Sequence, residues 1–151
     1  TISRNFEWRN PVILFESTLK LSEGKEGLKD TRVHFNLGTA YLNNGLYDKA
    51  IIEFNEALKG LAFPRCKRAH YQLAFAYLAK SSYKEAEDEL LKAIEADPNY
   101  ISAYYLLGNL YKKEGDIDKA KEAWQKLIKI KALYPKDEVL IKKVKELLDS
   151  R

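Results

Sequence analysis

Three imperfect copies of one segment follow one another along this chain, and the central copy runs from Lys67 to Tyr100. Each copy contains a leucine, a small residue and a tyrosine at fixed spacing, beginning at Leu37, Leu73 and Leu107. The pattern therefore recurs after 36 residues and again after 34. A period of this length is typical of stacked repeats, in which each unit buries its apolar face against the next one. The sequence predicts such a stack.

Further positions of the three copies share a chemical character. Each copy has a small residue, then an alanine twelve positions later, then a large apolar residue four positions after that: Gly38, Ala50 and Phe54; Ala74, Ala86 and Leu90; Gly108, Ala120 and Trp124. Leucine, tyrosine and phenylalanine at helical spacing form an apolar stripe. The facing small residues let two antiparallel helices approach closely. Each copy is therefore predicted to be a helical hairpin.

The pattern resembles the tetratricopeptide repeat, whose signature is W-x2-L-G-x2-Y, followed by A-x3-F and by a proline. Pro98 occupies the closing proline position of the central copy. The opening Trp position holds His34, His70 and Tyr104. The matching positions are Leu37, Gly38, Tyr41, Ala50, Phe54 and Ala57; Leu73, Ala74, Tyr77, Ala86, Leu90 and Ala93; and Leu107, Gly108, Tyr111, Ala120 and Trp124. The resemblance implies an all-α fold, a right-handed α-solenoid of helix-turn-helix hairpins with an N-terminal half-repeat helix and a C-terminal capping helix.

We expect residues 1–151 to form a single domain of this kind. Its expected units are a half-repeat helix at 11–21, repeat one at 31–64, repeat two at 67–100, repeat three at 101–134 and a capping helix at 136–149. The helices of the three repeats are expected near 31–44 and 47–60, 65–80 and 83–96, and 101–114 and 117–132. Residues 22–30 are expected to form a loop. The chain starts at Thr1 and contains no methionine, so we expect it to be a piece of a longer protein.

The composition suits a soluble, helix-rich chain, with 32% charged and 46% hydrophobic residues. The net charge of +4 comes from lysines interleaved with Glu and Asp, which favours a solvated face over a nucleic-acid partner. The longest apolar run, Leu73 to Ala79, is far too short to span a membrane, so we expect no membrane insertion by this segment. Cys66 is the single cysteine, so the chain has no internal disulfide, and the compartment stays open between cytoplasmic and extracytoplasmic.

The face that the first helices of the repeats present is the candidate functional site. The resemblance implies that these helices line a concave groove and that the ligands are extended or helical peptides. The residues expected to face the groove are Arg32, Phe35, Asn36, Thr39, Asn43, Arg68, Tyr71, Gln72, Phe75, Tyr105, Asn109 and Lys112. The aromatic members would form a track, the amides could hydrogen-bond a peptide backbone, and the arginines would favour a carboxylate or acidic partner. The alternative is that the aromatic rings only shield the helix packing.

The sequence argues against other kinds of site. Members of this family that clamp the acidic tail of chaperones use two lysines, two asparagines and an arginine at positions that here hold Phe35, Thr39, Gln72, Ser102 and Leu106. None matches, so no such clamp is expected. His34 and His70 lack a third ligand, so packed histidines are favoured over a metal pair. The acidic residues are expected on outer helix faces, and without any catalytic or cofactor motif we expect neither an enzyme nor a cofactor.

The N-terminal segment offers a second resemblance. The segment that contains Arg4, Asn5 and Trp8, together with residues 34–38 further along the chain, resembles the start of certain tetratricopeptide tails. Such tails follow the last membrane span of polytopic proteins related to dolichyl-phosphate-mannose-type glycosyltransferases. The leading hypothesis is a non-enzymatic scaffold that binds a peptide segment of a partner protein in the concave groove. The alternatives are an accessory domain of such a membrane-bound glycosyltransferase-like protein, and a self-assembly module that associates through its terminal helices.

Overall fold

The computed structural model of the chain describes residues 10–22, 28–61 and 66–149, and every structural statement below concerns these ranges. They form helices joined by turns, with no strand in the described ranges. The helices are α2 (Pro11–Ser22), α3 (Leu28–Asn43), α4 (Tyr47–Lys59), α5 (Lys67–Ala79), α6 (Tyr83–Ala96), α7 (Ile101–Glu114), α8 (Ile117–Ile128) and α9 (Pro135–Asp149). The N-terminal motif of Arg4, Asn5 and Trp8 lies outside the described residues.

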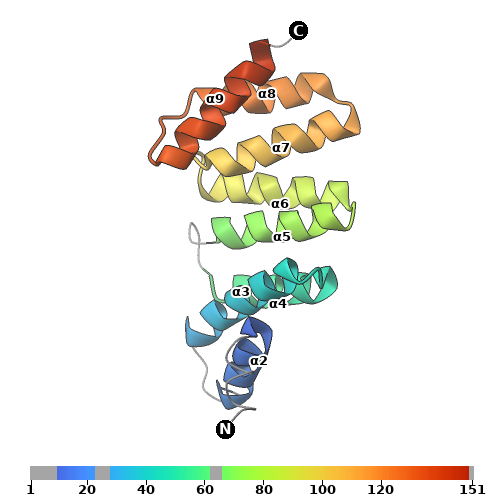
Figure 1. Cartoon of the computed structure of the whole chain (residues 1–151), viewed down its shortest axis with the longest axis vertical. Coiled ribbons are helices and arrows are strands. Elements are labelled where there is room, and N and C mark those ends of the chain that lie inside the picture. The colour runs from blue at the N-terminus through green and yellow to red at the C-terminus, as the bar shows by residue number, and fades with distance from the viewer. Residues whose placement is uncertain (1–9, 23–27, 62–65, 150–151) are drawn as a thin grey trace.

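The helices pair into antiparallel hairpins, which we call hairpin one (α3 and α4), hairpin two (α5 and α6) and hairpin three (α7 and α8). The hairpins lie one above another along the long axis of the molecule, with α2 at one end and α9 at the other (Figure 1). The predicted all-α solenoid of helical hairpins, preceded by a half-repeat helix and followed by a capping helix, is confirmed.

The turn inside each hairpin has the same geometry. Gly45, Ser81 and Gly115 occupy equivalent positions, with φ angles of 73°, 61° and 87°. In every turn the next residue donates its N–H to the carbonyl oxygen of the tyrosine of the repeat pattern, at 2.9 Å in each case. A residue with positive φ closes helix ends in this way, and glycine is favoured there because it has no Cβ. The repeat pattern therefore fixes the turns as well as the helices.

The small residues of the repeat pattern lie where the two helices of a hairpin cross. Ala50 and its counterparts in the other hairpins are fully buried. A Cβ added to Gly38 would lie 2.8 Å from Phe54 Cδ1, so a larger residue does not fit opposite that ring. The buried residues form one apolar cluster around hairpin one and another around hairpins two and three, and Tyr77 packs against both. The apolar interior is therefore continuous along the stack.

Helix α2 packs against hairpin one at the N-terminal end of the stack. Val12, Phe15 and Leu19 pack against the apolar cluster of hairpin one. Glu16 Oε1 accepts a hydrogen bond of 2.5 Å from the hydroxyl group of Tyr41 in α3. An apolar face and one buried polar contact therefore attach α2 to the stack.

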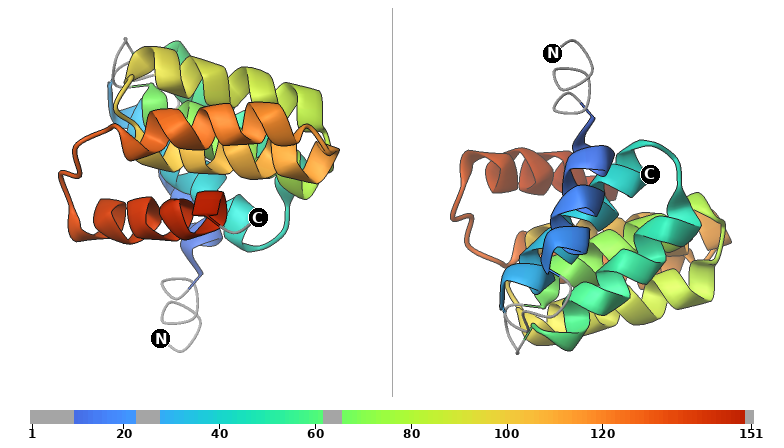
Figure 2. Two further views of the ribbon diagram at one scale, coloured as in Figure 1. Left: turned by 90° about the horizontal axis from the view of Figure 1, so that it is seen from above. Right: turned by 90° about the horizontal axis from the view of Figure 1, so that it is seen from below.

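Helix α9 lies beside hairpin three on the side of its first helix, as the view from above shows (Figure 2). Val144 is fully buried and packs into the same cluster as hairpin three. On the same helix, Lys143 Nζ lies 5.3 Å from the ring centroid of Tyr105 in α7. Helix α9 therefore covers part of the face that α7 would otherwise present.

Two predicted boundaries were wrong. Helix α8 ends at Ile128 and not at 132, and residues 129–134 form an irregular connector to α9. The carboxylate of Asp137, in the first turn of α9, accepts hydrogen bonds from the backbone N–H groups of Leu133 at 3.3 Å and Tyr134 at 3.1 Å. These bonds start α9 and fix the connector, because they satisfy N–H groups that a helix start leaves free. Helix α3 begins at Leu28, so residues 28–30 belong to a helix and not to a loop.

Candidate functional site

The residues that were expected to face the groove all retain solvent exposure. In the burial pattern, Arg32, Asn43, Arg68, Phe75 and Lys112 are exposed. The others are half-buried: Phe35, Asn36, Thr39, Tyr71, Gln72, Tyr105 and Asn109. None of these side chains belongs to the buried interior, so each is available to a partner unless another element covers it.

A pocket of about 550 Å³ opens where hairpins two and three meet the start of α9. Helix α5 contributes Lys67, Arg68, Tyr71 and Gln72; the junction of α6 and α7 contributes Asp97, Asn99, Tyr100, Ile101 and Ser102; and the connector with α9 contributes Lys131, Leu133, Tyr134, Lys136 and Asp137. Of the residues expected to face the groove, Arg68, Tyr71 and Gln72 are brought together here. The remaining nine do not line the pocket.

Two tyrosines form one wall of the pocket. The ring centroids of Tyr71 and Tyr100 lie 5.4 Å apart with the ring planes tilted by 56°, a favourable aromatic arrangement. Burial raises the pKa of Tyr71 and raises the pKa of Tyr100 to about 12. Both phenols therefore keep their protons at neutral pH and can donate hydrogen bonds.

The acidic groups of the pocket are already engaged. Asp97 Oδ2 lies 2.5 Å from Lys67 Nζ, and its Oδ1 accepts a bond of 3.0 Å from the backbone N–H of Asn99. Burial raises the pKa of Asp97, but the hydrogen bonds from Lys67 and Asn99 outweigh burial and lower it. Asp137 is taken up by the backbone of the connector. Neither carboxylate forms an ion pair with Arg68 or Lys136.

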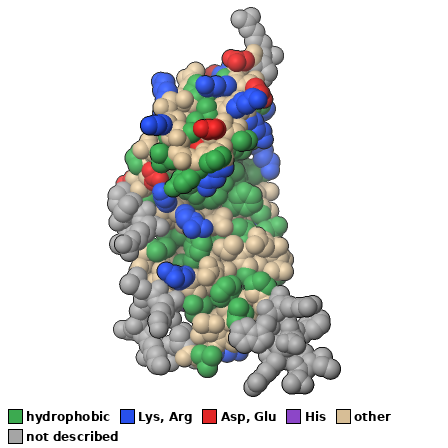
Figure 3. Space-filling model, turned by 60° about the vertical axis from the view of Figure 1, so that its left-hand side comes forward, with side chains coloured by type: hydrophobic (Ala, Val, Ile, Leu, Met, Phe, Trp, Pro, Cys, Tyr) green, Lys and Arg blue, Asp and Glu red, His purple; other side chains and the backbone are tan. Residues whose placement is uncertain are grey.

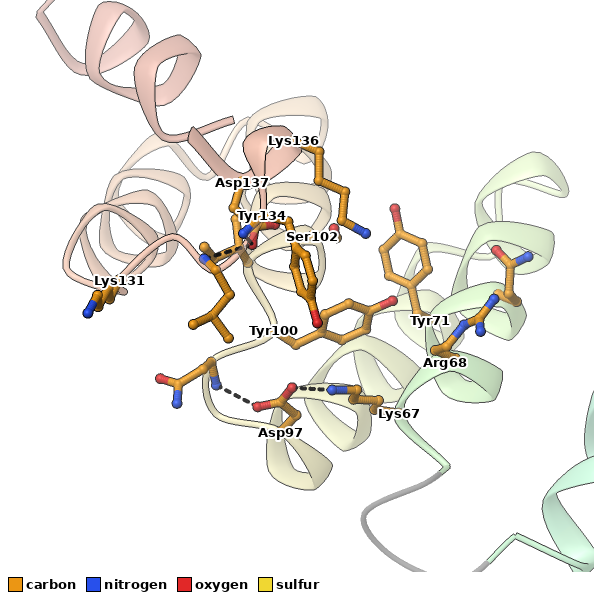
Figure 4. A pocket seen from close by; sticks show the side chains of 14 residues that line it. Lys67, Arg68, Tyr71, Asp97, Tyr100, Ser102, Lys131, Tyr134, Lys136 and Asp137 are labelled. Atoms are coloured by element: carbon orange, nitrogen blue, oxygen red, sulfur yellow. Dashed lines mark hydrogen bonds and ion pairs between the residues drawn. The ribbon is translucent and has the colours of Figure 1, made fainter. Parts of the chain in front are cut away.

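Cations without such partners stand around the same pocket. Among the described residues, Arg68 and Lys136 make no ion pair: the Arg68 guanidinium lies 5.3 Å from the ring centroid of Phe35, and Lys136 Nζ lies 5.6 Å from that of Tyr134. In the close view Lys136 reaches from α9 toward Tyr71, whereas Lys131 points away from the other side chains (Figure 4). The pocket therefore has a positive character.

The wider face around the pocket has the same character. With the left-hand side of the stack turned forward, apolar side chains gather along the middle of the molecule, and Lys and Arg prevail over Asp and Glu among the charged groups (Figure 3). A partner that approaches this side meets an apolar and basic surface.

The expected aromatic track is interrupted at both ends. In hairpin one, the ring of Phe35 packs against the buried ring of Phe54, with the two ring centroids 5.8 Å apart. In hairpin three, Tyr105 is covered by Lys143 of α9. Burial raises the pKa of Tyr105, but hydrogen bonds with Lys143 and Asn109 outweigh burial, so the pKa is lower than usual. Phe75 stays 46% exposed, in the middle of the track.

The two histidines have a partner that the sequence analysis missed. His34 Nδ1 lies 2.7 Å from Glu53 Oε2, and His70 Nδ1 lies 2.7 Å from Glu89 Oε2. Glu89 is only 8% exposed, so the expectation that the acidic residues lie on outer faces is wrong for it. The repeated spacing of 19 residues between His and Glu was visible in the sequence. In the described ranges no group of three potential metal ligands comes together.

The pocket residues of the connector were also missed, although the repeat register pointed to them. Tyr134 follows Tyr100 after 34 residues, and Lys136 follows Arg68 after twice that spacing, 68 residues. The register therefore continues into α9, which occupies the place of a first helix. None of the described helices is both long enough and apolar enough to traverse a lipid bilayer.

Comparison with known proteins places the chain among repeat proteins. Residues 31–59 match the family model of the tetratricopeptide repeat, and residues 61–151 match the model described as regulator of microtubule dynamics protein 1-3. The hairpins and the first match define a tetratricopeptide repeat protein. The second match covers more than half of the chain, and the chain belongs to the family of regulator of microtubule dynamics proteins 1-3.

Several curated relatives share part of this sequence. DnaJ homolog subfamily C member 3 of Bos taurus is 31% identical over 66% of this chain, which spans 19% of that protein. Photosystem I assembly protein Ycf3 of Prochlorococcus marinus is 28% identical over 87% of this chain and 83% of its own length. Protein O-mannosyl-transferase Tmtc3 of Drosophila melanogaster is 23% identical over 89% of this chain, which spans 15% of the relative.

Solved structures share the fold. A crystal structure of MamA superimposes with a TM-score of 0.69 at 27% identity, over 91% of this chain and 76% of MamA. The crystal structure of PcrH in complex with the chaperone binding region of PopB has a TM-score of 0.73 at 16% identity, over 82% of this chain and 98% of the PcrH chain. At this identity the second likeness concerns the fold alone.

Proposed function

We propose that this chain is a non-enzymatic interaction module that binds a peptide segment of a partner protein. The observation that carries the proposal is the pocket of about 550 Å³ between hairpins two and three and α9. Its wall offers the ring faces of Tyr71 and Tyr100 for packing, and Gln72, Asn99 and Ser102 offer hydrogen-bonding groups at the same place. Aromatic walls combined with polar groups that converge on one place are a common form of a binding site.

The groove beyond the pocket extends the proposed site along α5. Phe75 lies one helical turn from Tyr71 and is 46% exposed, which is a large exposure for a phenylalanine. Exposed apolar side chains next to a pocket mark interaction surfaces. The PcrH structure named above, which contains a region of PopB, supports a peptide ligand by analogy of fold, and the name of the relative Ycf3 is that of an assembly protein.

A peptide-binding assay with a double substitution tests this proposal. We expect Tyr71→Ala together with Phe75→Ala to abolish the binding of peptides selected from a random library, while the helical circular dichroism is retained. Ile52→Ala, at an exposed apolar residue of α4 away from the pocket, is the control and should bind normally. Peptide binding that survives the double substitution would contradict the proposed site, and loss of the helical spectrum would assign the two rings to the core.

The match to Tmtc3 favours a second candidate function. The chain aligns with that O-mannosyl-transferase over 89% of its own length, in agreement with the N-terminal resemblance to membrane glycosyltransferase tails. We propose as the alternative an accessory domain that presents an extended acceptor protein to a catalytic domain elsewhere in a longer chain. It predicts binding of unfolded acceptor chains and no turnover by this segment alone, and a sugar-transfer assay with the isolated segment checks the second point.

Self-association is a further proposal that rests on the end helices. Ile13 and Leu21 in α2 and Val139 in α9 are exposed at opposite ends of the stack. Copies that joined end to end would cover these residues. Sedimentation at increasing concentration tests the proposal, because a mass that stays monomeric contradicts it.

A further inference from the structure

We infer that the pocket receives an acidic segment of the partner, with a carboxylate beside a large apolar side chain, and that α9 and its connector form half of this site. The inference rests on the proposed function, because it specifies the peptide that the module binds. It assigns a recognition role to a helix whose only expected role was to cap the stack.

The balance of charge in the pocket favours an acidic ligand. Asp97 is held by Lys67 and by a backbone N–H, and Asp137 by two backbone N–H groups. Within the described part of the chain Arg68 and Lys136 make no ion pair, and each cation lies over an aromatic ring. The pocket is lined by four cationic and two carboxylate side chains, so a partner carboxylate would meet an excess of positive charge in which Arg68 and Lys136 form no ion pair with a described residue. Hydrogen bonds between ionised groups are stronger than those between neutral groups, so this charge favours an acidic ligand.

The repeat register relates the cation of α9 to the cation of α5. Lys136 occupies in α9 the position that Arg68 occupies in α5. Because equivalent positions of successive first helices point to the same side of a solenoid, the two cations face one binding surface. Figure 4 shows Lys136 extending toward Tyr71, on the helix that also carries Arg68. The site therefore needs α5 and α9 together.

Apolar side chains form the rim of the pocket on the α9 side. Leu133 and Tyr134 on the connector both line the pocket and are 71% and 60% exposed. The hydrogen bonds that Asp137 accepts hold the backbone of the two connector residues in place. Large apolar side chains held at a pocket mouth favour a ligand that buries them. A leucine, isoleucine or phenylalanine next to the partner carboxylate would do so.

The arrangement differs from the chaperone-tail clamp considered above. Two of the clamp positions, Gln72 and Ser102, line the pocket but carry no charge. The cations come instead from Arg68 and from the added helix. A segment with an internal Asp or Glu therefore fits as well as a chain terminus, because nothing in the pocket requires a terminal carboxylate.

Selection from a random twelve-residue peptide library displayed on phage, with the 151-residue chain immobilised, tests the inference. We expect the selected pool to be enriched in Asp or Glu next to Leu, Ile or Phe. Fluorescence anisotropy then measures one selected peptide against its counterpart with Asn and Gln in place of Asp and Glu. The amide version should bind about tenfold more weakly, and higher salt should weaken only the acidic version.

Charge reversal in α9 locates the site. Lys136→Glu should weaken the acidic peptide at least about tenfold, because it replaces an attraction by a repulsion. Lys142→Glu makes the same change of charge at an exposed position of α9 outside the pocket and should alter the affinity less than about twofold. Thermal melting compares the stability of both variants, and Lys136→Gln replaces Lys136→Glu if the latter does not fold.

Two outcomes would overturn the inference. If the pool has no excess of acidic residues, or if Lys136→Glu binds as Lys142→Glu does, the acidic site fails while peptide binding by the groove stands. If the chain enriches no peptide of any charge, the proposed function fails together with the inference.

Discussion

His70 Nδ1 lies 2.7 Å from Glu89 Oε2 and thereby links the two helices of hairpin two at the point where they cross. Lys92 Nζ adds a second contact to the same carboxylate at 2.6 Å. A carboxylate that is only 8% exposed is stable in its ionised form because two donors replace the water it has lost. The corresponding link between His34 and Glu53 makes this a recurring element of the first two hairpins.

The buried carboxylate predicts a loss of stability in acid. Burial raises the pKa of Glu89, but the hydrogen bonds from His70 and Lys92 outweigh burial and bring the pKa below the ordinary value of 4.5. A carboxyl group whose pKa is lower in the folded than in the unfolded state stabilises the fold at a pH above its unfolded-state pKa. This stabilisation disappears as the pH falls through its folded-state pKa. We expect the free energy of unfolding to fall below about pH 4.5, and to fall less steeply in Glu89→Gln.

Urea unfolding followed by circular dichroism between pH 3 and pH 7 measures this difference. At pH 7, Glu89→Gln should cost about 1–3 kcal/mol, the usual range for losing a buried hydrogen bond to a charged group. Glu95→Gln, at an exposed position of the same helix, is the control and should leave both the stability and its pH dependence nearly unchanged. Equal acid slopes in all three proteins would show that Glu89 contributes nothing to the pH dependence.

Hairpin three lacks this link and can receive it. The equivalent positions hold Tyr104 and Ala123, which line a second pocket of about 230 Å³. Lys126 stands three residues after Ala123, as Lys92 stands three residues after Glu89. We expect Tyr104→His and Ala123→Glu to stabilise each other in the double variant by about 1 kcal/mol or more relative to the sum of the single changes. A double-mutant cycle of urea unfolding measures the coupling, and strictly additive effects would contradict it.

The hairpins could be predicted from the sequence because three copies set the phase of every helix. The predicted ranges 83–96 and 101–114 coincide with α6 and α7, since turns with Ser81 and Gly115 bound them at known register. The His–Glu links were not predicted, because the pattern of a single helix does not show which residue of the neighbouring helix a carboxylate faces. Only the comparison of repeats, with the same spacing twice, places those carboxylates at a crossing.

The pocket could be predicted only in part. Arg68, Tyr71 and Gln72 follow from the helical face of a first helix, which periodicity determines. Tyr134 and Lys136 stand in repeat register with Tyr100 and Arg68, but the path of the connector decides whether that register places them at the pocket. Two hydrogen bonds that Asp137 accepts from backbone N–H groups hold the connector in place. In the sequence, a carboxylate that caps a helix from inside its first turn looks the same as any surface acid.

The turn of hairpin two predicts a stabilising substitution. Ser81 has a φ of 61°, whereas glycine occupies the equivalent position in the other two turns. A residue with a Cβ is strained at such a φ, so we expect Ser81→Gly to raise the free energy of unfolding by about 0.5–1 kcal/mol. The substitution also removes a hydrogen bond between Ser81 and Tyr83, so the gain in the free energy of unfolding should lie at the lower end of this range. The control is Gly115→Ala, which should destabilise by a similar amount in thermal melts; a lower melting temperature for Ser81→Gly would refute the argument.

The crossing of hairpin three predicts a destabilising change and its rescue. A Cβ on Gly108 would lie 2.1 Å from Trp124 Nε1, a contact that the rigid indole cannot avoid. We expect Gly108→Ala to cost about 1–3 kcal/mol, the usual range for overpacking. Hairpin two accommodates Ala74 because its facing residue is Leu90, and both are fully buried.

The same comparison predicts that Trp124→Leu relieves the clash. In the double variant the pair becomes the one that hairpin two already uses, so it should be more stable than the sum of the single changes by about 1 kcal/mol or more. Trp124→Leu also removes an indole N–H that is buried without a hydrogen-bond partner among the described residues, which lowers its own cost. Urea unfolding followed by circular dichroism compares the four proteins without relying on the fluorescence of the substituted tryptophan. If Gly108→Ala is as damaging beside leucine as beside tryptophan, the clash lies with the backbone of α8 and not with the indole.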